Sequence, residues 1–417
     1  MPVRSASLYH ALRCFCLGGF SLLARELEAG AELPFSFEEH TAPGRPSLYE
    51  YRPLVRSFVE ARAERLTART DARTAVEELR REPAAAIFAR AHAGTKPSED
   101  EALVRTVLLP LLTKTAEACS GFDWDDGAFD HAYAELERSL FGGKRSYVAV
   151  APLIGLSTGV QVELGRGLRV RPSPSGELAA HWPEARGLLP PDFGREPDRM
   201  CVLELEQALR PDASEPPDSP GELADAVTAL RLATAAPVAA GPVLFERIDW
   251  RPLGIRPVLP IASTQPVGEA SRLDRFRAGL ARDLLERLAA ADDDPELAEA
   301  LDRWELALYQ DEPFRSEQLR ESLVALLGGS DGLWAAALRA SLLLGESPRE
   351  RAALMARFRR LIEGERADDH VADLLRRALL EALMHGERAR LVVALDDALL
   401  GLRPRPSGYF ASRAVAS

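Results

Sequence analysis

The chain has 417 residues, of which 46% are hydrophobic and 28% charged, and its net charge is −12 at pH 7. This length allows two or three domains with sizeable cores. The negative charge argues against a protein that coats DNA or RNA along its whole length, although it is compatible with a local basic groove. Arg, Asp and Glu carry most of the charge, and Ala and Leu are abundant, which favours helix.

The cysteines indicate a reduced, cytoplasmic protein, because Cys14, Cys16, Cys119 and Cys201 are too few and too scattered for a disulfide framework. Cys14 and Cys16 also lack the C-x-x-C spacing of zinc and redox motifs. The apolar run 13–24 resembles the core of a signal peptide, but it continues into Arg25 and Glu26 without a small-residue cleavage site. It is too short to span a bilayer, so we expect a core helix and no membrane contact.

Helical spacing of apolar residues organises the first part of the chain, and we take residues 1–92 as an N-terminal helical region. The predicted helices cover residues 5–29, 54–69 and 70–91, with a loop at 34–53. A linker at 93–100 follows, and Ser98 is a plausible N-cap for a further helix that carries Leu103 and Val107 at core spacing.

The acidic segment at Asp123, Asp125 and Asp126 precedes another helix, where acids complement the helix dipole. A calcium-binding EF-hand is excluded, because position twelve of such a loop would be Ala134 instead of Glu. No histidine pair has the spacing of zinc ligands. We therefore expect neither a metal nor a cofactor.

Residues 101–270 form a mixed α/β central region in our prediction. Alternating polar and apolar residues predict a β-hairpin near 160–171, with further extended segments at 201–206 and 243–260 and a helix at 222–235. Ser157 lies in a G-x-S-x-G pattern, but a strand follows it where a nucleophile elbow needs a helix. The proline-rich segment 211–220 is expected to be an exposed loop.

From residue 271 the pattern is helical throughout, and Gly and Pro mark the breaks. The predicted helices cover residues 271–290, 295–310, 314–327, 332–345, 348–363, 369–385 and 387–400. We assign residues 271–402 to one helical bundle and 403–417 to a flexible tail. The fold class is α+β and predominantly α-helical, with a small antiparallel β region in the middle.

The C-terminal helices carry the motifs LRESLVALLGG, WAAALRASLLLG, ERAALMARFRRLIEG and RRALLEALMHGE. In order and spacing they resemble the HEPN domain of the ApeA-like branch, over roughly residues 105–400. The resemblance implies a helical bundle that usually dimerises. It also implies kinship with metal-independent ribonucleases of phage defence, toxin–antitoxin systems and stress responses, in which a histidine and an arginine of the last long helix combine across the dimer interface.

The chain keeps the histidine of this motif as His385, but its arginine and acidic positions correspond to Leu380 and Val324. Loss of the arginine should remove most of the rate, because that cation stabilises the developing oxyanion. Arg377 lies two helical turns before His385, on the same stripe as Glu381, and the resemblance leaves it as a substitute cation. The same stripe is also compatible with an ordinary solvent-facing ladder of ion pairs.

Three arginines are candidates for phosphate binding: Arg388, which follows the histidine, and Arg357 and Arg360 in the preceding helix. Our preferred hypothesis is a catalytically degenerate HEPN-type protein that binds RNA or a protein partner in a bacterial defence or stress pathway, as a homodimer through the C-terminal bundle. One alternative is a metal-independent endoribonuclease in which His385 is the general acid/base and Arg377 or Arg388 binds the phosphate. The other is a scaffold subunit without nucleic-acid contact.

Overall fold

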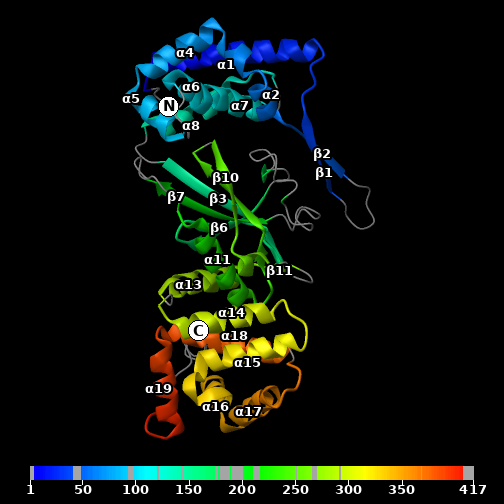
Figure 1. The fold of residues 1–417 in the computed structure, drawn as a ribbon, viewed down its shortest axis with the longest axis vertical. Helices are drawn as coiled ribbons and strands as arrows, with labels where there is room; N and C mark the ends of the chain where they lie inside the picture. The colour runs from blue at the N-terminus through cyan, green and yellow to red at the C-terminus, as the bar shows by residue number, and fades with distance from the viewer. Residues whose placement is uncertain are drawn as a thin grey trace.

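The computed structural model describes residues 4–40, 48–92, 98–119, 122–141, 145–173, 177–178, 188, 201–209, 217–249, 251–264, 270–290, 293–367 and 369–406. The molecule is elongated, and its layers follow the chain order (Figure 1). N-terminal helices form one end, a β-sheet lies in the middle, and the C-terminal helices form the other end. The fold is therefore α+β and predominantly helical, as predicted.

The N-terminal layer has its own hydrophobic core, which runs from Leu8 to Leu140. It therefore continues beyond the expected boundary at residue 92 and includes the helices that follow. The elements are α1 (Ala6–Glu28), α2 (Val55–Glu60), α3 (Ala63–Thr67), α4 (Thr70–Arg80), α5 (Pro83–His92), α6 (Glu99–Leu103), a π-helix (Val104–Leu108), α7 (Leu109–Ala118) and α8 (Asp126–Phe141).

Helix α1 contains the apolar run that resembles a signal peptide. The helix is 23 residues long, and the Ser5 side chain caps its first turn by accepting from the Leu8 N–H. By length and composition alone it is long enough to cross a membrane, unlike the shorter run considered in the sequence. One side of it, including Phe15 and Leu23, is buried in the N-terminal core.

The segment predicted as a loop at 34–53 is instead a β-hairpin. Strands β1 (Phe35–His40) and β2 (Leu48–Pro53) pair antiparallel, with Phe35 opposite Pro53. The turn residues of this segment led to the prediction of a loop, although Phe35 and Phe37 in one strand and Tyr49 and Tyr51 in the other alternate with polar residues, as a strand requires. The hairpin projects away from the helical layer (Figure 1).

The central sheet is antiparallel and has the strand order β10-β9-β3-β7-β6-β5, with β8 paired to the end of β3. Its strands are β3 (Arg145–Ile154), β5 (Val162–Gly165), β6 (Leu168–Pro172), β7 (Cys201–Leu209), β8 (Ala239–Ala240), β9 (Val243–Ile248) and β10 (Arg251–Pro257). Alternation directs Tyr147 and Ala149 to one face and Val148 and Val150 to the other, so each face has its own apolar cluster.

The predicted hairpin near 160–171 is confirmed as β5 and β6. Its turn has positive φ at Gly165, Arg166 and Gly167, which explains the two glycines. Ser157 lies in the short strand β4 (Leu156–Ser157), which pairs with β11 (Ser271–Arg272). No helix follows this serine, so the nucleophile elbow remains excluded. Most of the proline-rich segment 211–220 lies outside the described residues.

The C-terminal bundle follows the sequence prediction closely. It contains α13 (Arg275–Ala290), α14 (Pro295–Ala307), α15 (Phe314–Leu327), α16 (Gly332–Leu344), α17 (Pro348–Ile362), α18 (Asp369–His385) and α19 (Arg388–Leu399). Two of these helices have capped N-termini: the Asp294 side chain accepts from the Leu297 N–H at the start of α14, and Ser347 and Glu350 form a capping box at the start of α17.

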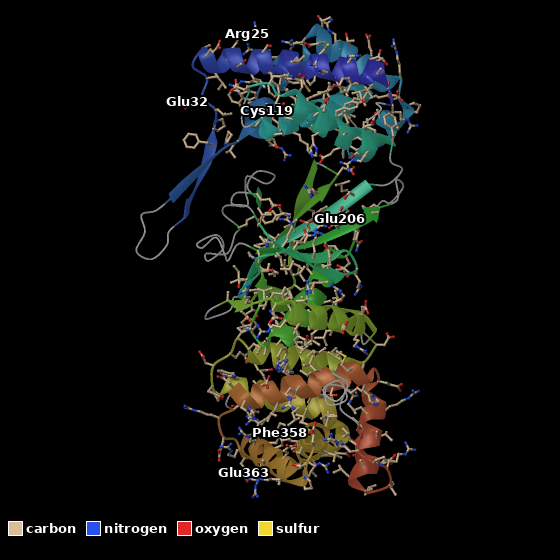
Figure 2. The ribbon with its side chains drawn as sticks, turned by 180° about the vertical axis from the view of Figure 1, so that it is seen from behind. Arg25, Glu32, Cys119, Glu206, Phe358 and Glu363 are labelled. Carbon is tan, nitrogen blue, oxygen red and sulfur yellow. The ribbon has the colours of Figure 1, made fainter. Side chains whose placement is uncertain are left out.

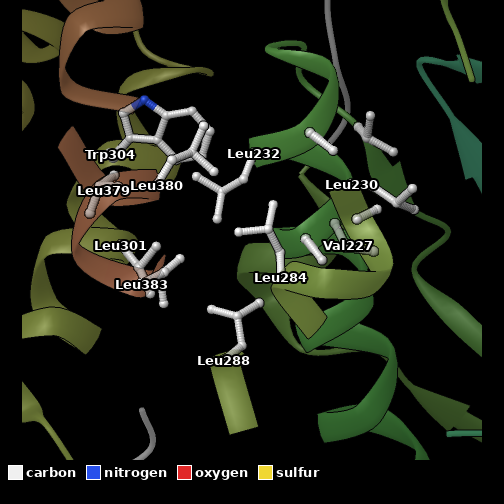
Figure 3. Close-up of a cluster of buried hydrophobic side chains, with 14 of the residues drawn as sticks. Val227, Leu230, Leu232, Leu284, Leu288, Leu301, Trp304, Leu379, Leu380 and Leu383 are labelled. Carbon is white, nitrogen blue, oxygen red and sulfur yellow. The ribbon is translucent and has the colours of Figure 1, made fainter. Parts of the chain in front are cut away.

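The sheet and the bundle share one continuous core through α11 (Ser219–Thr234) and α13. The short helix α12 (Pro260–Ser263) lies beside them. Leucines of α11 and α13 meet Leu301 and Trp304 of α14 and Leu379 and Leu383 of α18 (Figure 3). Trp304 is fully buried, and its indole N–H donates to the Ala372 carbonyl at 3.3 Å. The expected boundary at residue 270 therefore does not divide two cores.

A buried ion pair joins the two parts of this core. Arg231 of α11 contacts Glu305 of α14 at 3.0 Å, and both side chains are buried. The guanidinium also donates to the carbonyls of Val238 and Ile261, at 2.7 and 2.8 Å. Burial raises the pKa of Glu305, and Arg231 opposes this shift.

Removing one member of this pair should strongly destabilise the protein. We expect Arg231→Met to lower the free energy of unfolding by about 3–5 kcal/mol, because Glu305 would keep a buried charge without its partner. The double variant with Glu305→Leu should recover part of that loss. Urea denaturation followed by tryptophan fluorescence measures both. As a control, Arg359→Ala breaks the exposed Arg359–Glu363 pair and should cost less than about 1 kcal/mol. Equal losses for Arg231→Met and the control would contradict the assigned role.

Candidate functional site

Helix α18 carries the positions that the HEPN resemblance singles out. The two apolar replacements differ in burial: Leu380 is 3% exposed and packs in the shared core, whereas Val324 of α15 is half-buried. Leu380 lies with Leu379 and Leu383 among the leucines that meet α11 and α13 (Figure 3). A charged side chain at position 380 would therefore have to enter a packed apolar contact, at high cost.

His385 is the last residue of α18, and its side chain is exposed. The helix ends there because Gly386 adopts a left-handed conformation, with φ of 86°. The Nδ1 atom lies 3.3 Å from the Glu387 carbonyl oxygen. Among the described residues, this is the only hydrogen-bonding contact of the imidazole ring. His385 is therefore accessible to solvent, and no arginine contacts it.

Arg388 is buried in contacts with α14 and α15. Its guanidinium approaches Asp294 and Glu296, each at 3.1 Å, and donates to the Leu326 carbonyl at 3.3 Å. The whole residue is only 9% exposed. The two carboxylates neutralise the charge of Arg388 within the protein. We therefore assign Arg388 a structural role in place of the expected phosphate contact.

Arg357 and Arg360 lie on α17. Arg357 is half-buried and Arg360 is exposed, while Arg359 between them pairs with Glu363. None of these residues lines a pocket described for the chain. The expectation that they bind phosphate stays a prediction.

Arg377 is exposed and lies at a pocket of about 520 Å³ between α11, α13, α16 and α18. This pocket, the bundle pocket, is lined by Ala233, Thr234, Ala235, Asp274, Phe276, Arg277, Leu280, Leu343, Leu344, Glu346, Arg376, Arg377, Leu380, Glu381 and Arg405. It brings Arg377 and Glu381 of the predicted stripe together. His385 does not line it.

Three of the four arginines of the bundle pocket are engaged. Arg376 pairs with Asp373 at 2.6 Å, Arg277 donates to the Arg272 carbonyl at 2.9 Å, and Arg405 donates to the carbonyl oxygens of Leu342 and Gly345. Arg377 has no hydrogen bond or ion pair with any other described side chain. Its guanidinium is therefore available to a ligand.

Phe276 is the second exceptional residue of the bundle pocket. It is 76% exposed, which is the highest exposure given for a large apolar side chain among the described residues. It precedes Arg277 in the first turn of α13. An exposed aromatic ring and an unpaired guanidinium at one pocket offer both a stacking surface and a charge for an anion.

Only part of the bundle pocket was predictable from the sequence. Arg377 was identified from its position on the α18 stripe, whereas Phe276 and Arg405 were missed because they are distant in the chain. Phe276 breaks the apolar periodicity of its helix, and that was the one available signal. Among the described residues, no group of three or more His, Cys, Asp or Glu side chains is placed to hold a metal ion.

Comparison of the chain with protein-family models, with curated proteins and with solved structures finds no match. The candidate site therefore rests on its own geometry and chemistry.

Replacing Arg388 should affect stability more than ligand binding. Arg388→Ala leaves Asp294 and Glu296 without their cation and the Leu326 carbonyl without a donor, so we expect unfolding to become easier by about 1–3 kcal/mol. Thermal denaturation followed by circular dichroism measures this change. The exposed neighbour Arg390 provides a control, since Arg390→Ala should shift the midpoint little. If Arg388→Ala is as stable as the wild type, the structural role is wrong and Arg388 is again a candidate for ligand binding.

Proposed function

We propose that this chain is a catalytically degenerate HEPN-type protein that binds single-stranded RNA at the bundle pocket, in a defence or stress response as the resemblance implies. The observation that carries the proposal is that the unpaired Arg377 and the exposed ring of Phe276 line the same pocket. Non-specific single-strand binding combines these two features: cations contact the phosphates, and aromatic rings stack on the bases.

The charge of the bundle pocket supports an anionic ligand. Its lining contains the four arginines 277, 376, 377 and 405 and the three acids Asp274, Glu346 and Glu381, on a chain that is acidic as a whole. Asp373, which lies outside the lining, pairs with Arg376, so the attraction for a phosphate comes from the unpaired guanidinium of Arg377 and not from a net excess of positive charge. The size of the pocket fits one nucleotide better than a duplex.

RNA binding is favoured over RNA cleavage by the surroundings of the histidine. Metal-independent cleavage by a histidine needs a cation on the phosphate. Arg388 is used inside the protein, position 380 is a buried leucine, and Arg377 lies at a pocket that His385 does not line. These three placements support binding without turnover.

Retention of a labelled single-stranded polyuridine RNA should weaken as salt is added. Arg377→Ala should reduce the slope of log affinity against log salt by about 0.7, because one phosphate contact is lost. Phe276→Ala should weaken binding by about 1–3 kcal/mol, the range for one stacked base. Fluorescence anisotropy across a salt series measures both.

The matched control for this experiment is Arg303→Ala, which removes a half-buried arginine of α14 that pairs with Glu299 and lies outside the bundle pocket. It should change neither affinity nor slope. The same RNA incubated in EDTA should stay intact with wild type and with His385→Ala. Salt-independent retention, or equal binding by all variants, would refute RNA binding at this pocket; cleavage lost in His385→Ala would support the endoribonuclease alternative.

We also propose that two copies pair through the bundle, using an apolar surface on α16 and α19. Most of the exposed large apolar residues of the described chain lie in the bundle, and six of them belong to this surface: Trp334, Leu338, Val393, Leu399, Leu400 and Leu402. Arg339 of α16 holds Asp396 of α19 at 2.7 Å, so the two helices form one platform. Exposed apolar groups concentrated in this way are typical of protein–protein contacts.

Trp334→Glu should convert a dimer into a monomer, since a buried, unpaired carboxylate opposes association. Light scattering after size-exclusion chromatography measures the mass directly. Phe314→Glu is the control, because Phe314 is also exposed but lies at the start of α15, outside this surface. A wild-type protein that is monomeric at high concentration would reject pairing through the bundle.

A further inference from the structure

A second and larger pocket of about 880 Å³ lies in the N-terminal layer, away from the bundle pocket. It opens between α2 and α3 on one side and the π-helix and α7 on the other. This N-terminal pocket is lined by Arg56, Glu60, Ala63, Glu64, Thr67, Glu101, Val104, Arg105, Leu109, Pro110, Thr113, Lys114, Glu117 and Ala118. Its volume falls in the range of small-molecule sites, about 300–1,000 Å³.

One wall of this pocket is an irregular helical turn. The Leu109 N–H bonds to the Val104 carbonyl, five residues back, and Pro110 follows. Proline has no N–H to donate to the Thr106 carbonyl, and its ring crowds that oxygen, so the helix widens here. Val104, Leu109 and Pro110 then present an aliphatic surface to the pocket. Single π turns are rare and frequently occur at functional sites.

Two of the cations at the N-terminal pocket already have acidic partners. Arg105 pairs with Glu101 at 2.7 Å, one turn away. Lys114 forms an ion pair with Glu135 of α8, which lies outside the pocket lining. Their charge is therefore largely compensated within the protein.

Three carboxyl groups are left uncompensated at the same place. Glu60, Glu64 and Glu117 line the pocket, and their carboxyl groups form no hydrogen bond or ion pair with a described residue. Glu117 is within electrostatic range of Arg56 and Lys114, but burial outweighs their effect and raises its pKa to about 7. Its side chain therefore changes charge near neutral pH, next to an aliphatic wall.

We propose that the N-terminal pocket binds a small organic cation, an amine or a guanidinium group carried on an aliphatic body. The charged head would pair with Glu117, with Glu60 and Glu64 adding favourable charge, and the aliphatic part would pack against the wall formed by Val104 and Leu109. Uncompensated carboxyl groups disfavour an anion. A metal ion is disfavoured too, since no group of three metal-binding side chains exists among the described residues.

The pH dependence follows from the ionisation of Glu117. Only the carboxylate pairs with a cation, and this group has a pKa of about 7. Binding of an amine that stays protonated throughout should therefore strengthen by about tenfold from pH 6 to pH 8. The same shift means that the folded protein holds this proton more tightly than the unfolded chain, so that ionisation opposes folding as the pH rises.

The test uses n-hexylamine as the probe and hexanoate as the charge-reversed comparison, with isothermal titration calorimetry on the full chain. We expect hexylamine to bind with the stated pH dependence and hexanoate not to bind. Glu117→Gln keeps the shape of the side chain and should weaken hexylamine binding about tenfold or more at pH 8 while removing its pH dependence. Glu60→Gln should weaken it less, since that side chain is exposed.

Glu363→Gln is the matched control and should bind like wild type. Glu363 lies in the bundle, at the opposite end of the molecule from Cys119, which is two residues beyond Glu117 (Figure 2). The proposal is overturned if hexanoate binds as well as hexylamine, if Glu117→Gln leaves affinity and pH dependence unchanged, or if the wild type binds neither probe. Circular dichroism on each variant confirms that the fold is retained.

Discussion

The contact between Arg231 and Glu305 fixes how the sheet-side helices meet the C-terminal bundle. Two fully buried charges are expensive to remove from water, and their attraction compensates for this only when the geometry is held. Here the guanidinium also satisfies the carbonyls of Val238 and Ile261, which belong to the chain between α11 and α14. One side chain therefore ties together segments that apolar packing alone could hold in several registers.

The leucine-rich contact around this ion pair determines where ligands can bind. Because apolar residues of α11, α13, α14 and α18 form one shared core, the polar positions of α18 are divided between different surroundings (Figure 3). Arg377 and Glu381 face the bundle pocket, whereas His385 lies at the exposed end of the helix. A catalytic pair needs its two groups on one substrate, and this division separates them.

Helix positions in the bundle were predictable because the signals are local: apolar spacing, N-caps and glycine stops all occur within a few residues. The hairpin β1–β2 was missed because the turn residues of its segment were given more weight than the short alternation of aromatic and polar residues in each strand. The extent of the cores was not predictable either, because Leu140 and Leu8 meet only in three dimensions. The candidate site divides in the same way. Arg377 was identified from helical spacing, but the burial of Arg388 depends on Asp294, which is 94 residues away.

The separate core of the N-terminal helices has a consequence for how the chain can be dissected. Residues up to Leu140 bury their apolar side chains among themselves, so a fragment ending near 141 keeps its interior intact. Cleavage at residue 270 would instead separate α11 from the bundle leucines that pack against it. Both fragments would then expose an apolar surface and tend to aggregate. A truncated protein without the N-terminal helices should therefore contain all residues after α8, so that the sheet and the bundle stay together.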